Sequence, residues 1–240
     1  MGTLRRYFLL EYRYLHSLII EKVYITFPEA FWVDPPAETP DASLSPVERA
    51  TALDTFPSYT NWLAPNYAPD TNPKRWAQEI WNLASFTPPN VHPTILFYLY
   101  GDLSAYITTL VHKKTDQEHY KLLDEFFRPY YSLLPHFSAE DPVCKPKAFL
   151  STEWQKDELS GYGSYCNIQI GAKDADGDIN AMRHGVPERR LWFAGEHTSP
   201  FEELGTVAGA YLSGEGIALR ILDTYGIPKP EFKTEKGHAV

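Results

Sequence analysis

The residues most able to do chemistry lie in a glycine-interrupted segment near the C-terminus. A short apolar run at residues 191–194 is followed by Gly195-Glu196, and from Gly205 to Leu222 small and apolar residues recur at helical spacing. This order predicts a buried strand, a loop and a helix. The first N–H groups of a helix lack internal partners and carry partial positive charge, so the segment is suited to bind an anionic or electron-rich ligand.

Glycines in the predicted helix bear on that interpretation. Gly205, Gly209 and Gly214 lower helix propensity, which indicates that another group passes close to the backbone. That group is either a ligand or a neighbouring sheet, because tight packing of a helix on a sheet favours small residues equally. The spacing alone leaves both alternatives open.

The residue identities are more specific than their spacing. Residues 194–198 (AGEHT) and 205–214 (GTVAGAYLSG) closely resemble the C-terminal FAD-binding segment of the flavin-containing amine oxidases. This family includes monoamine oxidases, polyamine oxidases and flavin-type histone lysine demethylases, and the residues here are most similar to those of fungal members. The resemblance implies an FAD cofactor, an amine substrate and dioxygen. It also implies that the cofactor is bound by Gly195, Glu196, Gly205, Thr206 and Val207.

The same resemblance implies individual roles. Glu196 lies near the phosphate and ribose of the cofactor, and because phosphate repels a carboxylate, we expect it to hold ribose hydroxyls or loop N–H groups. The Val207 N–H faces the pyrimidine edge of the flavin. Thr206 stands where monoamine oxidases carry a second tyrosine, so a two-tyrosine cage is not expected. His197 is expected to be a loop residue without a catalytic role.

A lysine near the N-terminus is a third candidate. Residues 21–27 alternate as a half-buried strand does, and Phe31-Trp32 follow. This resembles the amine oxidases, and the resemblance implies that Lys22 holds a water near flavin N5. The alternative is a solvated lysine on an edge strand. Residues 15–20 (LHSLII) replace the glycine-rich turn that precedes this lysine in the family.

Trp154, followed by Gly163-Ser164-Tyr165, also matches a pattern of the family. The resemblance implies that Tyr165 forms one wall of the substrate site beside the flavin and that Trp154 packs near its ring system. An aromatic face can guide an amine by apolar contact and by cation–π attraction before the amine loses its proton. The alternative is that both residues are ordinary buried aromatics.

The sequence lacks the glycine fingerprint that opens a dinucleotide-binding fold. No Gly-x-Gly-x-x-Gly occurs, and Gly161-Tyr162-Gly163 lacks the third glycine and the following helix. The resemblance covers residues 21–226, so we expect a C-terminal fragment of an FAD-dependent amine oxidase. The alternative is an inactive fragment, a pseudoenzyme or an interaction module. We expect residues 1–20 to be an amphipathic helix, a weak targeting segment or sequence foreign to the native fold, and favour the third because the resemblance begins abruptly at about residue 21.

Periodicity predicts the remaining elements. Strands are expected at residues 76–83, 94–100, 149–154 and 166–170, and helices at 101–110, 115–134 and 178–183. Residues 33–72 read as a surface connection with a helical turn near 46–50, anchored by Phe56, Tyr59 and Trp62. The fold class is therefore α+β with an incomplete α/β portion: a mixed-sheet substrate domain plus the C-terminal strand-loop-helix of an incomplete, Rossmann-like FAD-binding domain.

These elements define four segments. They are an atypical N-terminal segment (1–20), a substrate-domain part (21–150), a C-terminal FAD-binding segment (151–226) and a tail (227–240). The incomplete sheet leaves an unpaired edge and an apolar face, which favours self-association.

Composition limits the partners. The chain has 22 basic and 31 acidic residues and a net charge of −9, which argues against nucleic acid and weakly favours cationic substrates. Cys144 and Cys166 provide neither a disulfide framework nor metal-ligand spacing. No apolar run reaches 18 residues, so no membrane span is expected. The compartment stays open, because the C-terminus is not a peroxisomal signal.

Overall fold

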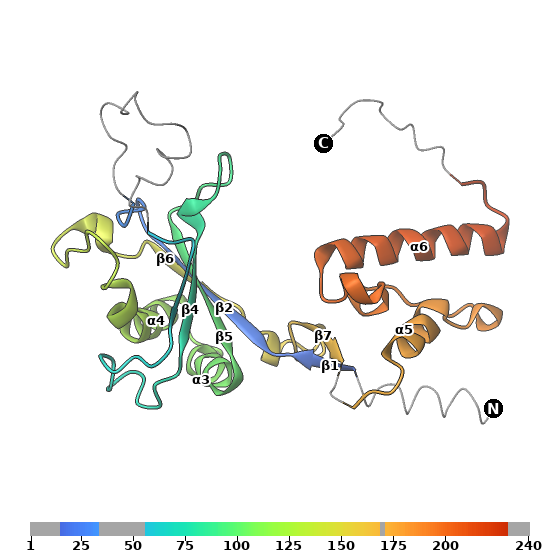
Figure 1. The fold of residues 1–240 in the computed structure, drawn as a ribbon, viewed down its shortest axis with the longest axis horizontal. Coiled ribbons are helices and arrows are strands. Elements are labelled where there is room, and N and C mark those ends of the chain that lie inside the picture. Colours follow the sequence, from blue (N-terminus) through green and yellow to red (C-terminus); the bar gives the residue numbers. More distant parts are fainter. Residues whose placement is uncertain (1–14, 34–55, 169–170, 230–240) are drawn as a thin grey trace. The chain divides into compact units, whose positions relative to one another are not determined.

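The computed structural model describes residues 15–33, 56–168 and 171–229, with only the backbone described at 15–18. These residues divide into two compact units (Figure 1). The first unit comprises residues 19–162. The second comprises residues 163–229 together with 15–18.

The first unit is built on a five-stranded sheet in the order β3-β4-β5-β2-β6. The strands are β2 (Ile20–Thr26), β3 (Tyr59–Trp62), β4 (Gln78–Asn82), β5 (Thr94–Tyr100) and β6 (Ala148–Ser151). Every neighbouring pair is antiparallel, so the expectation of a mixed sheet is wrong. The strands predicted near residues 21–27, 76–83, 94–100 and 149–154 are confirmed, with shorter bounds for the second and the last.

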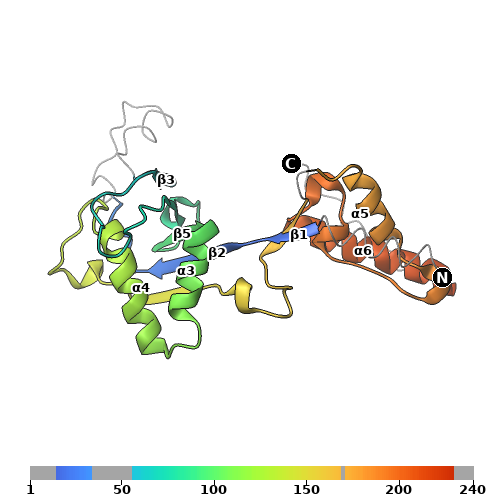
Figure 2. The ribbon, with the colours of Figure 1, turned by 90° about the horizontal axis from the view of Figure 1, so that it is seen from below.

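One face of this sheet is covered by two helices (Figure 2). They are α3 (Gly101–Val111) and α4 (Asp116–Tyr131), and both confirm predicted helices. Strand alternation puts Val23 and Ile25 of β2 on the helix side, where they join one buried cluster with Ile107 and Phe127. The opposite face therefore carries Lys22 and Tyr24.

Helix α4 shows how local sequence fixes the element. Thr115 and Glu118 form a reciprocal capping box at its start. The apolar stripe that includes Leu123, Phe127 and Tyr130 is buried, which confirms the prediction that these residues belong to the core. The helix ends at Tyr131, three residues earlier than expected. Short 3₁₀ turns complete the unit: η1 (Leu83–Ser85), η2 (Pro142–Cys144) and η3 (Trp154–Lys156).

The second unit contains a two-stranded antiparallel ribbon and two helices. The ribbon pairs β1 (Leu15–Leu18) with β7 (Tyr165–Ile168). The helices are α5 (Ala175–His184) and α6 (Val207–Tyr225), as predicted for residues 178–183 and 205–222. The turns η4 (Pro187–Arg189), η5 (Glu196–Thr198) and η6 (Phe201–Glu203) join the helices.

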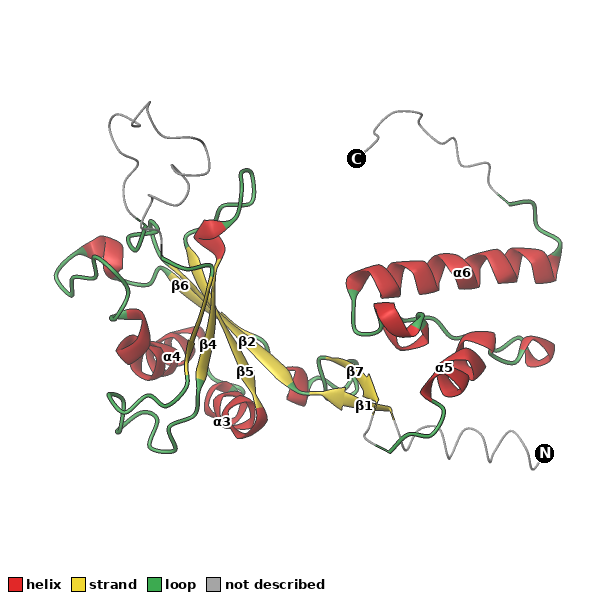
Figure 3. Cartoon of the chain, viewed as in Figure 1, coloured by secondary structure: helices red, strands yellow, loops and turns green. Residues whose placement is uncertain are grey.

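The strand predicted at residues 191–194 is wrong. Figure 3 draws this segment as loop between short helical turns, and its one ladder contact is an isolated bridge between Val186 and Leu191. Leu191 is 41% exposed. An apolar run becomes a strand only when a neighbouring strand pairs with it along its length, and here the ladder is a single bridge at Leu191.

Two other expectations need correction. The connection predicted at residues 33–72 contains β3, which adds an edge to the sheet. Within it Phe56 and Trp62 pack against the core, whereas Tyr59 is exposed and contacts Trp81. The predicted turn at residues 46–50 and the last two residues of the strand predicted at 166–170 lie outside the described residues.

The structure also describes the cysteines, the length of the helices and the grouping of metal-ligating side chains. Cys144 and Cys166 are free thiols. Within the described ranges, no helix is long and apolar enough to cross a membrane. The same residues hold no cluster of three or more metal-ligating side chains.

Candidate functional site

In the second unit Glu196 ties β7 to the loop before α6. Its carboxylate accepts hydrogen bonds from the Cys166 N–H (2.7 Å) and thiol (2.8 Å) and from the Gly205 N–H (2.7 Å). Burial, the thiol's hydrogen bond and the nearby Glu196 charge raise the pKa of Cys166 to about 12, so the thiol keeps its proton and acts as a donor. Two kinds of contact were expected for Glu196, ribose hydroxyls or loop N–H groups. The structure shows the second, in the bond from the Gly205 N–H.

Gly205 provides a close approach to Tyr165. Its φ of +75° lies in the left-handed region, and a Cβ atom there would lie 2.9 Å from Cδ2 of the Tyr165 ring. Only glycine therefore fits without displacing the ring. The structure thus brings together Tyr165, Glu196 and Gly205, three residues from the predicted site.

The conformation of the loop explains why residue 195 is a glycine. Its φ is +141°, and an added Cβ would lie 2.6 Å from the His197 ring. The Gly195 N–H donates to Ser213 Oγ of α6 (2.9 Å). His197 is thus packed within the loop, as expected for a residue that shapes the turn.

Thr206 caps α6. Its hydroxyl accepts from the Gly209 N–H (2.8 Å) and donates to the Glu203 carbonyl (2.8 Å). A Cβ on Gly209 would lie 2.2 Å from that same carbonyl oxygen, whereas Gly214 has nothing within 4 Å. The small residue at position 209 is therefore required by packing within the chain.

The cap leaves the next two amides available. In the part of the chain that the structure describes, no recorded hydrogen bond uses the N–H of Val207 or Ala208. Val207 is 88% exposed. The Glu196 carboxylate is occupied by its three donors, so the start of α6 offers free N–H groups, which suits an electron-rich edge such as that of a flavin.

In the first unit Lys22 lies on β2 between β5 and β6, so it is not on an edge strand. Its Nζ is 5.1 Å from the centroid of the Tyr98 ring, its cross-strand partner on β5. Its backbone exchanges hydrogen bonds with Thr152: Lys22 N–H donates to Thr152 Oγ1 (2.8 Å), and Thr152 N–H donates to the Lys22 carbonyl (2.9 Å). The lysine is thus held on a central strand.

Lys22 begins a row of aromatic side chains on the face opposite the helices. Register places Tyr98, Glu79, Trp81 and Tyr59 on this face. Ring centroids are 6.1 Å apart for Tyr98–Trp81 and 5.3 Å apart for Trp81–Tyr59. Trp81 is 39% exposed and Tyr59 is 44% exposed. No site role was predicted for this row, although the alternation of Glu79 and Trp81 with the apolar Ile80 was a usable signal.

Trp154 begins η3 and is partly exposed. Its backbone N–H donates to Oε2 of Glu21 (3.1 Å), a residue that is fully buried. No role was predicted for Glu21 from the sequence. The available signal was a carboxylate at a position where strand alternation predicts a core residue, in line with Val23, Ile25 and Phe27.

The predicted site residues thus form two sets. Tyr165, Glu196, Gly205 and their neighbours belong to the second unit, while Lys22 and Trp154 belong to the first. Their roles toward a cofactor stay predictions.

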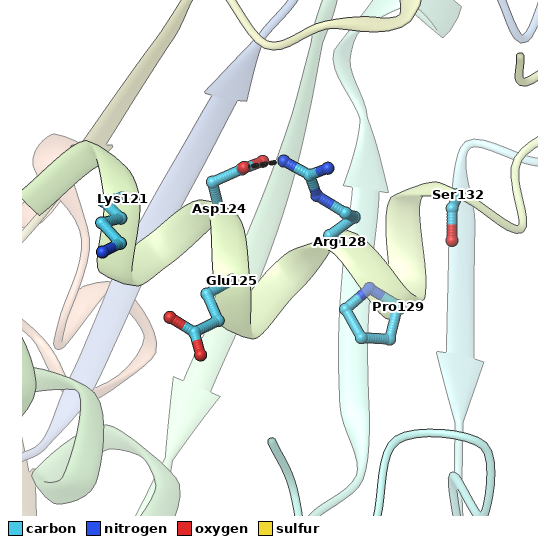
Figure 4. A pocket seen from close by; sticks show the side chains of 6 residues that line it. All are labelled: Lys121, Asp124, Glu125, Arg128, Pro129 and Ser132. Carbon is cyan, nitrogen blue, oxygen red and sulfur yellow. Dashed lines mark hydrogen bonds and ion pairs between the residues drawn. The ribbon is translucent and has the colours of Figure 1, made fainter. Parts of the chain in front are cut away.

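A surface hollow on α4 is separate from both sets (Figure 4). It is lined by Lys121, Asp124, Glu125, Arg128, Pro129 and Ser132. Asp124 and Arg128 form an ion pair within the helix, and Tyr131 donates to Asp124. Asp124 and Arg128 are thus bonded within the helix, and we assign no ligand to this hollow.

Comparison with known proteins assigns the family. Residues 4–222 match the model of the flavin containing amine oxidoreductases, a range that begins well before residue 21, where the resemblance was expected to begin. No curated protein gives a match to the chain. The family uses a flavin cofactor, typically FAD. Since the match spans most of its 240 residues, the chain belongs to the flavin-containing amine oxidoreductase family.

Proposed function

We propose that this chain takes part in FAD-dependent oxidation of an amine, with residues 195–207 meeting the cofactor. The observation that carries the proposal is that, among the described residues, no hydrogen bond uses the N–H groups of Val207 and Ala208, while the Glu196 carboxylate is already bonded to Cys166 and Gly205. Such a site attracts an electron-rich edge without opposing it with an uncompensated carboxylate.

A bound flavin would supply the acceptor for a hydride from the amine; the resulting iminium would lose its N–H proton to become an imine, and dioxygen would take up the two electrons and two protons to give hydrogen peroxide. Around that chemistry the chain's own residues bind and orient. The Val207 N–H would donate to the pyrimidine edge of the flavin, and Tyr165 would form one wall of the substrate site. By the family resemblance, Trp154 would pack near the ring system and the Lys22 ammonium would hold a water.

The aromatic row on the sheet supports an amine substrate. Tyr98, Trp81 and Tyr59 present π faces on the side of the sheet that carries Lys22. Aromatic faces attract ammonium groups, and the net charge of −9 favours the approach of cations. Threonine at position 206, where monoamine oxidases carry a second tyrosine, supports a site with one tyrosine wall, formed by Tyr165.

Flavin titration tests the proposal. We expect saturable quenching of flavin fluorescence by the purified chain. Val207→Pro should weaken it, because proline removes the N–H yet is tolerated at the first helical position. Val207→Ala keeps the N–H and serves as the matched control. Absence of saturable binding, or equal binding by both variants, would contradict the proposal.

A second candidate, an interaction module, is favoured by the exposure of α6. Of its 19 residues only Gly209 and Ile217 are buried, while Tyr211 is 70% exposed. An apolar helix with so little covered surface is suited to bind another protein layer or a second copy of the chain. In sedimentation velocity, Tyr211→Glu should reduce self-association and Thr224→Glu, at a polar exposed position, should not. Equal self-association of both variants would contradict the proposal that α6 is an interaction surface.

A further inference from the structure

A buried carboxylate links the strand of Lys22 to the turn of Trp154. Glu21 is fully buried, and Oε2 accepts hydrogen bonds from the Thr152 hydroxyl (2.7 Å) and the Trp154 N–H (3.1 Å). Oε1 accepts from the Gln155 N–H (3.0 Å). One side chain thereby holds three donors from the segment that follows β6.

The connection continues to Lys22 itself. The Thr152 hydroxyl that donates to Glu21 also accepts the Lys22 N–H (2.8 Å), and the Thr152 N–H donates to the Lys22 carbonyl. A continuous set of hydrogen bonds therefore runs from the backbone of Lys22 through Thr152 and Glu21 to the backbone of Trp154.

Helix α3 holds the same turn from its other end. The Gln155 side-chain nitrogen lies 3.3 Å from both Ser104 Oγ and Thr108 Oγ1, and those two residues are buried. The turn is thus fixed against both the sheet and the helix that covers it.

The physical chemistry makes Glu21 hard to replace. A buried carboxylate is costly unless donors surround it, and the first N–H groups of a helical turn need an acceptor from outside that turn. Glu21 meets both needs at once, with charge-assisted bonds to Trp154 and Gln155. An amide in its place directs an N–H₂ group at N–H or hydroxyl donors, so part of the set must break.

We propose that Glu21 is a positioning residue that fixes the Trp154 indole relative to Lys22 within residues 19–162, independently of cofactor or substrate. The relevance of this placement to catalysis rests on the proposed function; the placement itself does not. If the Trp154 indole is held in place before ligands bind, less entropy is lost in ordering the site when they do.

The test uses ¹⁹F NMR of the full chain labelled with 5-fluorotryptophan. The six tryptophans give six signals, and Trp154→Phe identifies the one that reports on the turn. We expect Glu21→Gln to shift or broaden the Trp154 signal by more than its linewidth while the other five stay in place. Glu79→Gln, an equal change of charge, is the matched control. Because Glu79 accepts from Trp81 (3.4 Å), it should move the Trp81 signal and leave Trp154 unchanged.

A second pair of variants keeps the proposal testable if Glu21→Gln loses its fold. Thr152→Val removes the bridging hydroxyl at constant shape and should move the Trp154 signal, whereas Thr152→Ser retains the hydroxyl and should restore it. An unmoved Trp154 signal in folded Glu21→Gln and Thr152→Val would overturn the proposal. If the signal moves while flavin-dependent amine turnover is unchanged, the positioning stands and the assignment of Trp154 to the reacting site fails.

Discussion

The Cys166 thiol donates a hydrogen bond to Glu196 Oε2 over 2.8 Å, and the N–H of the same residue donates to Oε1 over 2.7 Å. One carboxylate thus receives both donors of a strand residue and, through Gly205, also fixes the loop before α6. The thiol therefore reports on the integrity of the predicted cofactor loop.

We expect Cys166 to react slowly with alkylating agents at pH 8, because burial first and Glu196 second raise its pKa to about 12. Glu196→Gln removes the negative charge, lowers the pKa and should raise the alkylation rate about tenfold for each pKa unit lost. The measurement is the pH–rate profile in a Cys144→Ser background. Glu203→Gln is the control, because Glu203 bonds Thr206 rather than Cys166. A profile that does not move to lower pH in Glu196→Gln would refute this link.

The same shift predicts a change of stability with pH. The unfolded thiol has an ordinary pKa near 9.0, whereas burial and Glu196 raise the pKa of the folded thiol to about 12. The folded state therefore binds more protons between these values, so the stabilisation present below pH 9 declines as pH rises toward 12. Hydrogen exchange of the β7 amides should accelerate over this range beyond its intrinsic pH dependence. Cys166→Ala should not show the extra acceleration.

Two glycines of the C-terminal segment should respond oppositely to alanine. Gly205→Ala places a Cβ 2.9 Å from the Tyr165 ring at a φ of +75°, which should destabilise the second unit by about 1–3 kcal/mol. Gly214→Ala has nothing within 4 Å inside α6 and should stabilise the helix by about 0.5–1 kcal/mol. Urea unfolding followed by circular dichroism compares them. Equal effects would show that the contact with Tyr165 does not constrain position 205.

Sequence patterns predicted elements whose signal is local. The alternation at residues 21–27 and the three-and-four spacing in residues 115–134 gave β2 and α4, because each buries one face against the same core. The strand predicted at 191–194 failed because an apolar run does not reveal whether a neighbour can pair with it. Strand β3 was missed because four residues in a polar, proline-rich connection carry too little periodicity.

Some residues of the candidate site could be predicted from the sequence, and others could not. The resemblance of residues 194–214 to the family's FAD-binding segment identified Glu196, Gly205 and Thr206, which the structure brings into one loop. Glu21 was missed because its partners Thr152 and Trp154 lie more than 130 positions away in the chain. Only the folded sheet shows that this carboxylate is bonded rather than misplaced.

His119 should make the packing of α4 on β6 sensitive to acid. Its Nε2 lies 2.7 Å from Ser151 Oγ, and burial lowers its pKa, with the charges of Glu153 and Asp116 opposing that effect. Below pH 6.5 the unfolded imidazole takes up a proton before the folded one, so stability present above that pH is lost as the pH falls. Hydrogen exchange should show faster opening of β6 at pH 5 than at pH 7 after correction for intrinsic rates. His119→Gln should flatten this dependence, and His184→Gln on α5 should retain it.

Lys22→Met tests the predicted role of the lysine that lies over Tyr98. Methionine keeps an apolar stem on the central strand but removes the ammonium 5.1 Å from the ring, so we expect an unchanged fold and unchanged flavin binding. Flavin reduction by an amine, or reoxidation by dioxygen, should slow at least about tenfold, which corresponds to ~1.4 kcal/mol in the barrier. Stopped-flow absorbance separates the two half-reactions. Lys74→Met is the matched control, because Lys74 makes a comparable contact with Trp76 at 5.4 Å without being a predicted site residue. If both variants retain wild-type rates, Lys22 has a structural role in the sheet and no role in flavin reduction or reoxidation.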